Sequence, residues 1–417
     1  MKTIRVLAVL VFSLFFYSNS FSQGETAIPT LEINPSPRLN ALGEIGAVFP
    51  NNDPLGFYYN PAQLGYISQS ENIALQVYPS NVNWIPQIFD IAYRNTSFNI
   101  GYNFEKMLNG LKLSAGFGYI HSRFDFGPYN NFNPQNINTN SNYPYDEFET
   151  YGLGIGIDYF VQLNIGVSYK NIYSLLDSQM VNGILKNYDA STTAMDYGIL
   201  MTVPAVKLID PGYQFNILQG IPASPYFNVS MGYSQLNVGK KIYYIDPAQS
   251  DPIPRTAKLG YTLSAGLDLK LNNSVLRAFG YDFIAEASDV LIRLDPTTNT
   301  TSYQSFIGDI IFGKNLIELK GDNNVVVHKG HNFSLFETVD FMAGRFDGGG
   351  YDHERTSGLG VRAKGVLTLL KAYTTNKAFH FIANHFDIQY YSAKIDLTGL
   401  GETRFEGVNV IFSGYEL

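Results

Sequence analysis

Residues 258–271, KLGYTLSAGLDLKL, alternate between two kinds of side chain. Every odd position, from Leu259 to Leu271, carries an apolar residue, and every even position, from Lys258 to Lys270, carries a glycine, a hydroxyl or a charge. Side chains on a β-strand point alternately to its two faces, so this stretch predicts a strand with one apolar and one polar face. At about 3.3 Å per residue, such a strand is long enough to cross a bilayer.

The same alternation recurs along the chain. It is found in residues 98–104, 111–119, 151–159, 163–170 and 227–234. A soluble β-sandwich also alternates, so the pattern alone does not decide between water and lipid as the surrounding solvent. The rest of the chain supplies that choice.

The N-terminus has the order of a secretory signal peptide. Lys2 and Arg5 precede an apolar run at 6–17, and the small residues Ser20 and Ser22 precede Gln23. We expect residues 1–22 to be removed on export. No later stretch has about 18 consecutive apolar residues, so a membrane location would require a closed barrel, whose strands leave no unpaired edge in lipid.

The composition favours a barrel. The 417 residues include 30 Tyr, 30 Phe and 38 Gly, with 15% charged residues, which is typical of an apolar-out, polar-in wall with aromatic girdles. We predict an all-β fold, a transmembrane antiparallel β-barrel of about 14 strands in the cell outer membrane. The net charge of -8 argues against nucleic acid as a partner. The absence of cysteine excludes disulfides and thiol catalysis.

Fifteen segments qualify as strands, although single-chain bacterial barrels have an even number, so one prediction is wrong, merged or outside the wall. They are 72–79, 87–94, 97–104, 111–122, 148–159, 162–170, 194–203, 225–235, 257–271, 273–285, 305–313, 332–346, 356–371, 378–390 and 405–413. The register leaves 72–79 as the surplus strand and places the connections near 123–147, 236–256 and 286–304 outside the cell. We divide the chain into a signal peptide (1–22), an N-terminal luminal hatch (23–70) and the barrel (71–417).

One ordered motif follows the signal peptide. Residues 31–48 read LEINPSPRLNALGEIGAV, and Asp53 precedes the box Tyr59-Asn60-Pro61-Ala62. This set resembles the N-terminal segment of FadL-like outer-membrane barrels, most closely the PorV/PorQ branch from Bacteroidota. The matching residues are Arg38, Ala41, Leu42, Gly43, Gly46, Asp53, Asn60, Pro61 and Ala62.

The resemblance implies a 14-stranded barrel whose N-terminal segment folds back into the lumen as a hatch. Two glycines, Gly43 and Gly46, would permit close backbone approach. Arg38, Glu44 and Asp53 are candidates to pair with charges on the polar faces of the strands. Those predicted lumen-facing charges are Lys112, Asp158, Lys170, Lys258, Asp268, Lys270, Arg362 and Lys364. For each we favour a structural role over one in transport.

The sequence offers little enzymatic chemistry. His328 and His331 lack the helix and glutamate of a zinc-protease motif, so we expect no metal site. His385 and Asp387 share a face of segment 378–390, but no serine stands beside them to complete a triad. The glycine run at 152–156 lies in a predicted strand and does not open a helix, which argues against dinucleotide binding. We expect a non-enzymatic protein without a cofactor.

Three functions remain open. By resemblance, the leading one is to assist type IX secretion by carrying, docking or retaining cargo at the cell surface, with secretion-machinery proteins and secreted cargo as partners. The first alternative is a FadL-like channel for hydrophobic compounds such as fatty acids, with a hydrophobic ligand. The second is a structural or adhesive surface barrel. Outer-membrane lipid is the expected surrounding in each.

Overall fold

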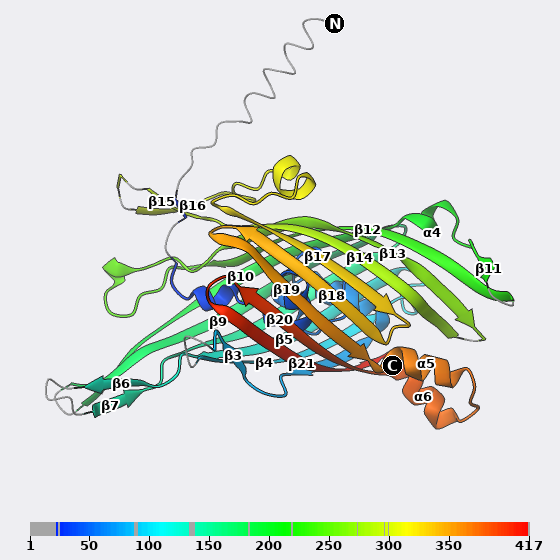
Figure 1. Ribbon diagram of the computed structural model, residues 1–417, viewed down its shortest axis with the longest axis horizontal. Helices are drawn as coiled ribbons and strands as arrows, with labels where there is room; N and C mark the ends of the chain where they lie inside the picture. The colour runs from blue at the N-terminus through cyan, green and yellow to red at the C-terminus, as the bar shows by residue number, and fades with distance from the viewer. Residues whose placement is uncertain are drawn as a thin grey trace, which may run out of the picture.

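The computed structural model describes residues 22–23, 26–86, 91–132, 138–181, 184–217, 220–272, 274–295, 297–298 and 300–415. The predicted signal peptide, residues 1–22, lies almost entirely outside this range. The described strands form a closed antiparallel barrel (Figure 1), because β10 pairs with β12 and β2 pairs with both β4 and β21. The predicted all-β transmembrane barrel of about 14 strands is confirmed.

Fourteen strands make the wall. They are β2 (Asn72–Val77), β4 (Ile91–Asn103), β5 (Lys112–Asp125), β8 (Tyr145–Asp158), β9 (Gln162–Val181), β10 (Ile184–Pro204), β12 (Ile221–Gly239), β13 (Thr256–Leu271), β14 (Ser274–Val290), β17 (Val325–Leu335), β18 (Val339–Gly348), β19 (Tyr351–Arg362), β20 (Phe386–Leu397) and β21 (Gly401–Ser413).

Short strands lie outside the wall. A small sheet joins β1 (Ser22–Gln23), β15 (Ile292–Asp295) and β16 (Thr300–Tyr303), while β6 (Tyr129–Phe132) pairs with β7 (Asn138–Asn142). Two more, β3 (Val82–Trp84) and β11 (Phe215–Ile217), extend the edges of β4 and β12.

Helical turns occur in two places. The segment 26–70 carries η2 (Pro29–Glu32), α2 (Pro37–Ala41), η3 (Gly56–Tyr58), α3 (Gln63–Ile67) and η4 (Ser68–Ser70). The connections between wall strands carry α4 (Ala205–Ile209), η6 (Pro247–Gln249), the π-helical turn η7 (Phe312–Ile317), α5 (Ala363–Lys371) and α6 (Lys377–His385). In the described residues no helix is both long and apolar enough for a membrane span.

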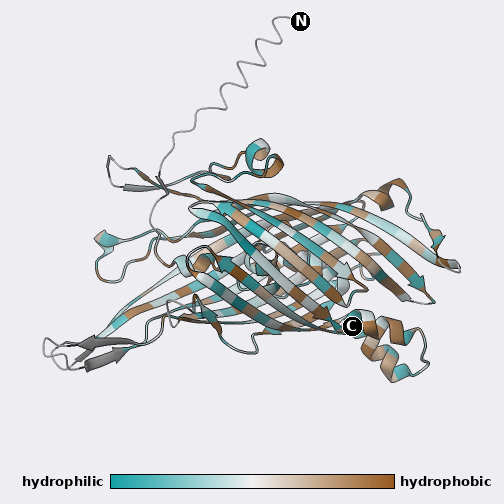
Figure 2. Cartoon of the chain, viewed as in Figure 1, coloured by the Kyte–Doolittle hydropathy of each residue, from teal (hydrophilic) through white to brown (hydrophobic). Residues whose placement is uncertain are grey.

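The two faces of the wall differ as the alternation predicts, and Figure 2 shows teal and brown alternating along the strands. On β13 the polar side chains of Lys258 and Thr262 point inward and are buried. Outward residues such as Leu153 and Ile155 on β8 are 58% and 48% exposed in the isolated chain. Because these exposed apolar side chains continue around a closed wall, they form the lipid-facing band.

The two ends of the barrel are distinguished by their connections. Long ones, 126–144, 240–255 and 291–324, lie at the end that carries β6, β7, β15 and β16, on the left in Figure 1. The C-terminus, the short turns 159–161 and 336–338 and the two helical connections lie at the other end. Since outer-membrane barrels have longer loops outside the cell, we call these the outer end and the periplasmic end.

The strand predictions needed five corrections. Segments 87–94 and 97–104 belong to one strand, β4, with residues 87–90 outside the described residues, and 332–346 contains two strands, β17 and β18. Segment 305–313 is not a strand. The end of the predicted strand 356–371 and the start of 378–390 are instead the helices α5 and α6, so only 356–362 and 386–390 belong to strands, β19 and β20. Segment 72–79 is no surplus, because β2 closes the wall between β4 and β21.

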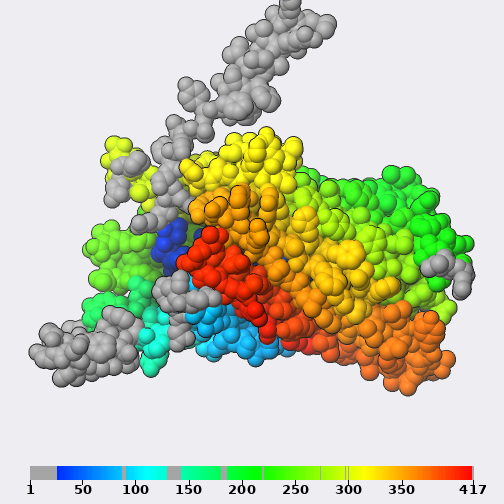
Figure 3. Space-filling view, in the orientation of Figure 1, coloured from blue at the N-terminus to red at the C-terminus, as the bar shows by residue number. Residues whose placement is uncertain are grey.

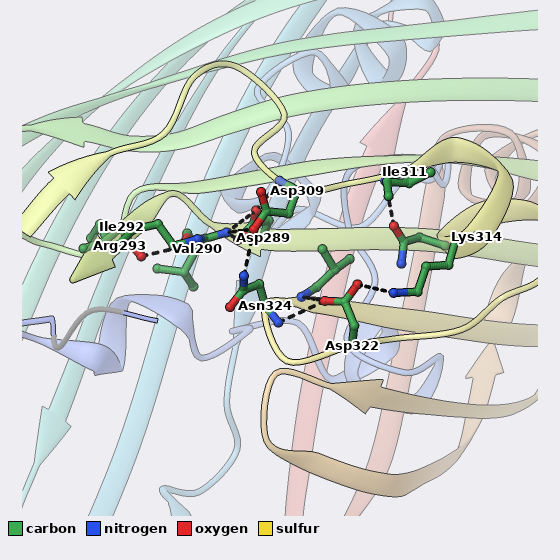
Figure 4. A network of polar contacts seen from close by, with 11 residues as sticks. Asp289, Val290, Ile292, Arg293, Asp309, Ile311, Lys314, Asp322 and Asn324 are labelled. Carbon is green, nitrogen blue, oxygen red and sulfur yellow. Dashed lines mark hydrogen bonds and ion pairs between the residues drawn. The ribbon is translucent and has the colours of Figure 1, made fainter. Parts of the chain in front are cut away.

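The connection 291–324 folds back over the outside of the wall. We call residues 304–320 the outer flap. Its Ile310 and Leu316 are buried against outward-facing Ala287, Val325 and Val327. At the base of the flap, the guanidinium of Arg293 binds Asp289 at 2.7 Å and Asp309 at 2.8 Å (Figure 4). The flap is therefore anchored to β14 by an ion-pair cluster in which Arg293 and Asp289 are buried and Asp309 is partly exposed.

Candidate functional site

Residues 26–70 run through the barrel lumen from the outer end to the periplasmic end. We call them the luminal segment, and Figure 3 shows its first residues in blue at the outer mouth. Ala27 donates its backbone N–H to Pro252 in an outer connection, and Ser114 on β5 donates its hydroxyl to the carbonyl of Gly65. Nearly every residue from Thr30 to Ser68 is buried or half-buried. The main apolar core lies between this segment and the inner face of the wall.

The segment is folded by its own polar contacts. Ser36 caps α2, because its Oγ accepts a hydrogen bond from the N–H of Leu39 at 3.1 Å. The same hydroxyl donates to a carboxylate oxygen of Asp53 at 2.5 Å, and Asp53 also accepts from the N–H of Leu55. Asp53 therefore joins two turns of the luminal segment, and it does not pair with a charge on the wall as expected.

Glycines let the segment approach the wall. At Gly43, whose φ is +92°, an added Cβ would lie 2.8 Å from the carbonyl oxygen of Lys329. On the wall side, a Cβ on Gly344 would lie 2.2 Å from the backbone nitrogen of Gly43. Gly46 faces Tyr59 within the segment, and an added Cβ at Gly46 would lie 2.6 Å from the Tyr59 side chain. Gly43 and Gly344 thus meet backbone to backbone, a contact that only residues without a side chain permit.

The remaining motif residues hold the segment in place. Leu42 and Ala41 are fully buried, and Thr356 on β19 donates to the Ala41 carbonyl. Asn60 donates its amide to the carbonyls of Ala47, at 2.6 Å, and Ile199 of β10, at 3.1 Å.

The Asn60 side chain also organises the turn that follows it. Its oxygen accepts from the N–H of Ala62 at 3.0 Å, which fixes the turn through Pro61. Pro61 is itself tight against Gly166 of β9, where an added Cβ would lie 2.3 Å from Pro61.

One wall carboxylate binds the segment directly. Glu286 on β14 accepts from the backbone N–H groups of Gly46, at 3.1 Å, and Ala47, at 2.8 Å. Its second oxygen accepts from the ammonium of Lys258 at 3.0 Å. The sequence pattern gave no sign of Glu286, because it stands in the irregular alternation at the end of β14.

Four of the predicted lumen-facing charges are paired within the wall. Lys170 pairs with Asp196 at 3.1 Å and Lys258 with Glu286 at 3.0 Å. Asp268 pairs with Arg277 and Arg362 with Asp340, each at 3.0 Å. These ion pairs are internal to the wall.

Two of these lysines also contact the luminal segment. The ammonium of Lys170 lies 4.4 Å from the ring centre of Tyr58, and that of Lys258 lies 4.2 Å from the ring centre of Tyr59. Adjacent luminal tyrosines thus each face a wall lysine, a pair of cation–π contacts that the sequence did not reveal.

The other four predicted charges are placed differently. Lys112 and Asp158 face each other across β5 and β8 at the periplasmic rim, and Lys270 is exposed near the end of β13. Lys364 is not in a strand. It lies in α5, and its ammonium donates to the carbonyls of Ala383 and Asn384 of α6. The prediction for Lys364 was wrong because the alternation of β19 ends at Arg362.

Arg38 has no carboxylate within 4.0 Å among the described residues, contrary to expectation. It donates to the amide oxygen of Asn52 at 3.1 Å and lies 5.4 Å from the ring centres of both Phe49 and Tyr391. Its Nε has no hydrogen-bond partner in the described chain. Arg38 lines a polar vestibule of about 790 Å³ that opens at the periplasmic end.

A second cavity lies on the outer side of the segment. It has a volume of about 180 Å³ and is lined by Glu32, Glu44 and Tyr59 of the segment and by wall residues that include Lys258 and His328. Burial raises the pKa of Glu32 to about 7, although a hydrogen bond from Thr256 and the charge of Lys258 lower it. Burial also raises the pKa of Glu44 to about 7, with Lys258 lowering it and Glu32 raising it.

Comparisons with known proteins found similar solved structures but no similar sequence. No protein-family profile and no curated protein sequence matches the chain. Among solved structures, the toluene transporter TbuX of Ralstonia pickettii is similar, with 10% identity and a TM-score of 0.38 over 91% of this chain and 98% of TbuX. A Pseudomonas aeruginosa FadL homologue matches with 9% identity and a TM-score of 0.34 over 95% of this chain and 100% of its own. The transport unit of the Escherichia coli autotransporter AIDA-I matches with 10% identity and a TM-score of 0.35, covering 83% and 91%.

The geometry of the wall itself indicates the class of protein. All fourteen strands are paired on both sides, so no strand edge exposes unpaired backbone N–H and C=O groups to lipid. The wall turns apolar side chains outward and polar ones toward the lumen. A chain with these properties belongs in a bilayer, and the protein is an outer-membrane β-barrel.

Proposed function

We propose that this protein is a sealed, non-enzymatic outer-membrane barrel that assists type IX secretion, acting on cargo or secretion-machinery proteins through its outer connections. The observation that carries the proposal is the filled lumen. The luminal segment is held by wall groups from separate strands, among them Glu286, Thr356 and Ser114. A barrel occupied in this way is suited to work through its surface, since its lumen has no room for a polypeptide.

The chemistry of the cavities supports the same proposal. Charged and hydroxyl-bearing side chains line both the outer cavity and the periplasmic vestibule, including Glu44, Lys258, Arg38 and Arg277. Hydrophobic ligands favour pockets lined mainly by apolar and aromatic side chains. The mostly polar lining of the vestibule is therefore a poor fit for a path along which a hydrophobic compound would travel.

The outer connections offer a contact surface. Tyr143, Leu176, Ile245 and Leu400 lie in or beside four different connections at the outer end, and each is more than two-fifths exposed. Tyrosine and large aliphatic side chains are frequent anchors in protein interfaces. Together with the resemblance of residues 31–62 to PorV/PorQ proteins, this surface supports cargo carriage, docking or retention at the cell surface.

The test compares the proteins released by a wild-type strain with those released by a strain that lacks the gene. We expect type IX cargo to be lost from the medium or the cell surface, and to return with the full-length chain. A chain in which 243–250 are replaced by a short Gly/Ser turn should complement less well. A chain with the periplasmic connection 205–217 shortened is the matched control. Unchanged secretion in the deletion strain would contradict the proposal.

A second candidate is a channel for hydrophobic compounds such as fatty acids. One observation favours it, namely that the outer cavity and the periplasmic vestibule lie on opposite sides of the same luminal segment. Displacement of that segment would join them. The same deletion strain tests this candidate, because loss of fatty-acid uptake with intact secretion would support the channel in place of the secretion role.

A further inference from the structure

We propose that the outer face of β17, β18 and β19 binds the phosphate headgroup of an anionic glycolipid in the outer leaflet. Lys329 pairs in register with Arg345 across β17 and β18, and Arg345 pairs with Arg355 across β18 and β19. We call these three residues the basic row. Neighbouring strands are about 4.8 Å apart, so the row places three cations within about 10 Å along one line of the wall.

The basic row faces away from the lumen. Its neighbours in sequence, His328, Gly344 and Thr356, all face inward. His328 Nδ1 lies 2.7 Å from the carbonyl oxygen of Gly43, and Thr356 Oγ1 donates to the carbonyl of Ala41 at 2.9 Å. Because side chains alternate along a strand, the three basic side chains point to the lipid side.

The two arginines of the row have donors that the described residues do not use. Arg345 and Arg355 are exposed, and in the described part of the chain neither has a hydrogen bond or a carboxylate within 4.0 Å. Lys329 is 9% exposed, and the nearest carboxylate oxygen, on Asp347, is 3.9 Å from its ammonium. A guanidinium presents five N–H donors in a fork that fits phosphate, so two free ones side by side make an anion site.

Acidic residues do not cancel the row. In register, the line continues from Arg355 to Asp396 on β20 and Glu402 on β21. Glu402 is already occupied by ion pairs with Lys394 and with Arg404, the latter at 2.6 Å. Asp396 beside Arg355 and Asp347 beside Lys329 offset two of the three positive charges, so the row keeps a net positive charge of one.

Apolar surface adjoins the row on its periplasmic side. Phe333, Phe341 and Leu359 each lie four residues from the row along their own strand. They are 38%, 51% and 43% exposed. That spacing is about 13 Å along a strand. The row therefore lies at the outer margin of the lipid-facing band, where headgroups begin.

The outer flap flanks the same surface. Its Phe312 and Ile317 are exposed beside the wall, with Leu316 buried beneath them. A ligand that meets both cations and apolar side chains is an amphiphile with an anionic headgroup. An acidic protein partner would use the cations but would leave Phe333 and Phe341 against lipid, so the surface favours the glycolipid.

The experiment measures glycolipid bound to the detergent-solubilised full-length barrel by native mass spectrometry. The probe is diphosphoryl lipid A, compared with the same lipid after enzymatic removal of its phosphates. The test variant is Arg345→Gln/Arg355→Gln. The control is Lys186→Gln/Lys377→Gln, which removes two exposed charges far from the row. Heat-modifiable migration in gel electrophoresis verifies that each barrel is folded.

We expect the test variant to lose at least tenfold in bound diphosphoryl lipid, the control to bind like the wild type, and Arg345→Lys/Arg355→Lys to retain part of the binding. The dephosphorylated lipid should bind at least tenfold less, and millimolar inorganic phosphate should not displace the lipid. Equal binding by the test variant, equal binding of the dephosphorylated lipid, or displacement by free phosphate would overturn the proposal. So would a test variant that keeps the lipid but loses an acidic secretion partner. The inference does not depend on the proposed secretion role.

Discussion

At the scale of single residues, the contact between Gly43 and Gly344 sets how deeply the luminal segment packs against β18. A Cβ on residue 344 would meet the backbone of Gly43 and Leu42 at 2.2–2.3 Å, and backbone cannot yield as a flexible side chain can. We expect Gly344→Ala to destabilise the folded barrel by about 1–3 kcal/mol, as other overpacked cores are destabilised.

Urea unfolding in detergent would measure this cost. Gly313→Ala is the matched control, because an added Cβ there meets nothing within 4 Å. Similar losses of unfolding free energy in both variants would show that the close contact with Gly43 is not what destabilises Gly344→Ala.

Glu32 and Glu44 make the stability of the luminal segment depend on pH. Their folded-state pKa of about 7 exceeds the value of 4.5 expected in an unfolded chain. A raised pKa stabilises the fold fully below pH 4.5, and this stabilisation is lost as the pH rises through 7. At about 1.4 kcal/mol per pKa unit, a rise from 4.5 to about 7 corresponds to about 3 kcal/mol. Water in the cavity lowers the cost of burying the charge, so we expect a loss of about 2 kcal/mol for each carboxyl.

The urea midpoint should therefore fall between pH 5 and pH 8 in the wild type. Glu32→Gln/Glu44→Gln removes both titrations and should flatten this dependence. The groups facing these carboxyls, Lys258, His328 and Tyr351, are kept in that variant. An equally steep pH dependence in the variant would assign the effect to other carboxyls.

The residue-level contacts were only partly predictable. The alternation correctly predicted that Lys170 and Lys258 face the lumen, because the face to which one side chain points follows from the faces of its neighbours in the strand. The alternation could not identify Asp196 or Glu286 as their partners, because the sequence of one strand does not determine its register with the neighbouring strand. Arg38 was expected to meet a carboxylate and instead lies between two aromatic rings, Phe49 and Tyr391.

At the scale of elements, strands were predicted well and the long connections poorly. After Arg362 the apolar residues Val366, Leu369 and Leu370 take the spacing of a helix, yet the preceding alternation favoured a continued strand. Asn376 is a helix N-cap, accepting from two backbone N–H groups of α6, and its type and position were a usable signal. Segment 305–313 is apolar because it packs on the outside of the wall. Its composition therefore resembles that of a wall strand, which explains the wrong strand prediction.

The outer flap depends on Arg293, whose guanidinium joins Asp289 to Asp309 (Figure 4). Arg293→Met would leave two carboxylates facing each other without a cation. Such a change costs about 3–5 kcal/mol for a fully buried pair, and we expect a smaller cost here because the Asp309 side chain is 39% exposed. We expect the flap to open, so that trypsin cleaves after Lys314 or Lys320 at least about tenfold faster than in the wild type.

Lys241→Met is the control for the flap, because that exposed lysine donates to the hydroxyl of Thr301 in the neighbouring small sheet and forms no ion pair with the described residues. Cleavage rates equal to the wild type in Arg293→Met would mean that Ile310 and Leu316 hold the flap without the ion pairs.

At the scale of the whole molecule, the wall and the luminal segment form one unit whose inner glycines match the segment's backbone. An added Cβ would lie 2.5 Å from Gly65 at Gly154 and 2.3 Å from Pro61 at Gly166, compared with 2.2 Å from Gly43 at Gly344. The motif at residues 31–62 and the glycine-rich inner face are thus two halves of one packing surface. The sequence displayed both halves, but only the closed wall shows which glycine meets which turn.

This matched packing predicts a barrel that does not conduct ions. In a planar bilayer we expect no steady conductance from the wild type and a stable open pore from a variant that lacks residues 27–67, because removing them leaves a polar lumen inside an intact ring of strands. Replacing the periplasmic connection 363–385 with a short turn is the control, since it shortens the chain outside the lumen and should stay closed. A conducting wild type, or a folded deletion variant that stays silent, would show that the luminal segment is not the seal.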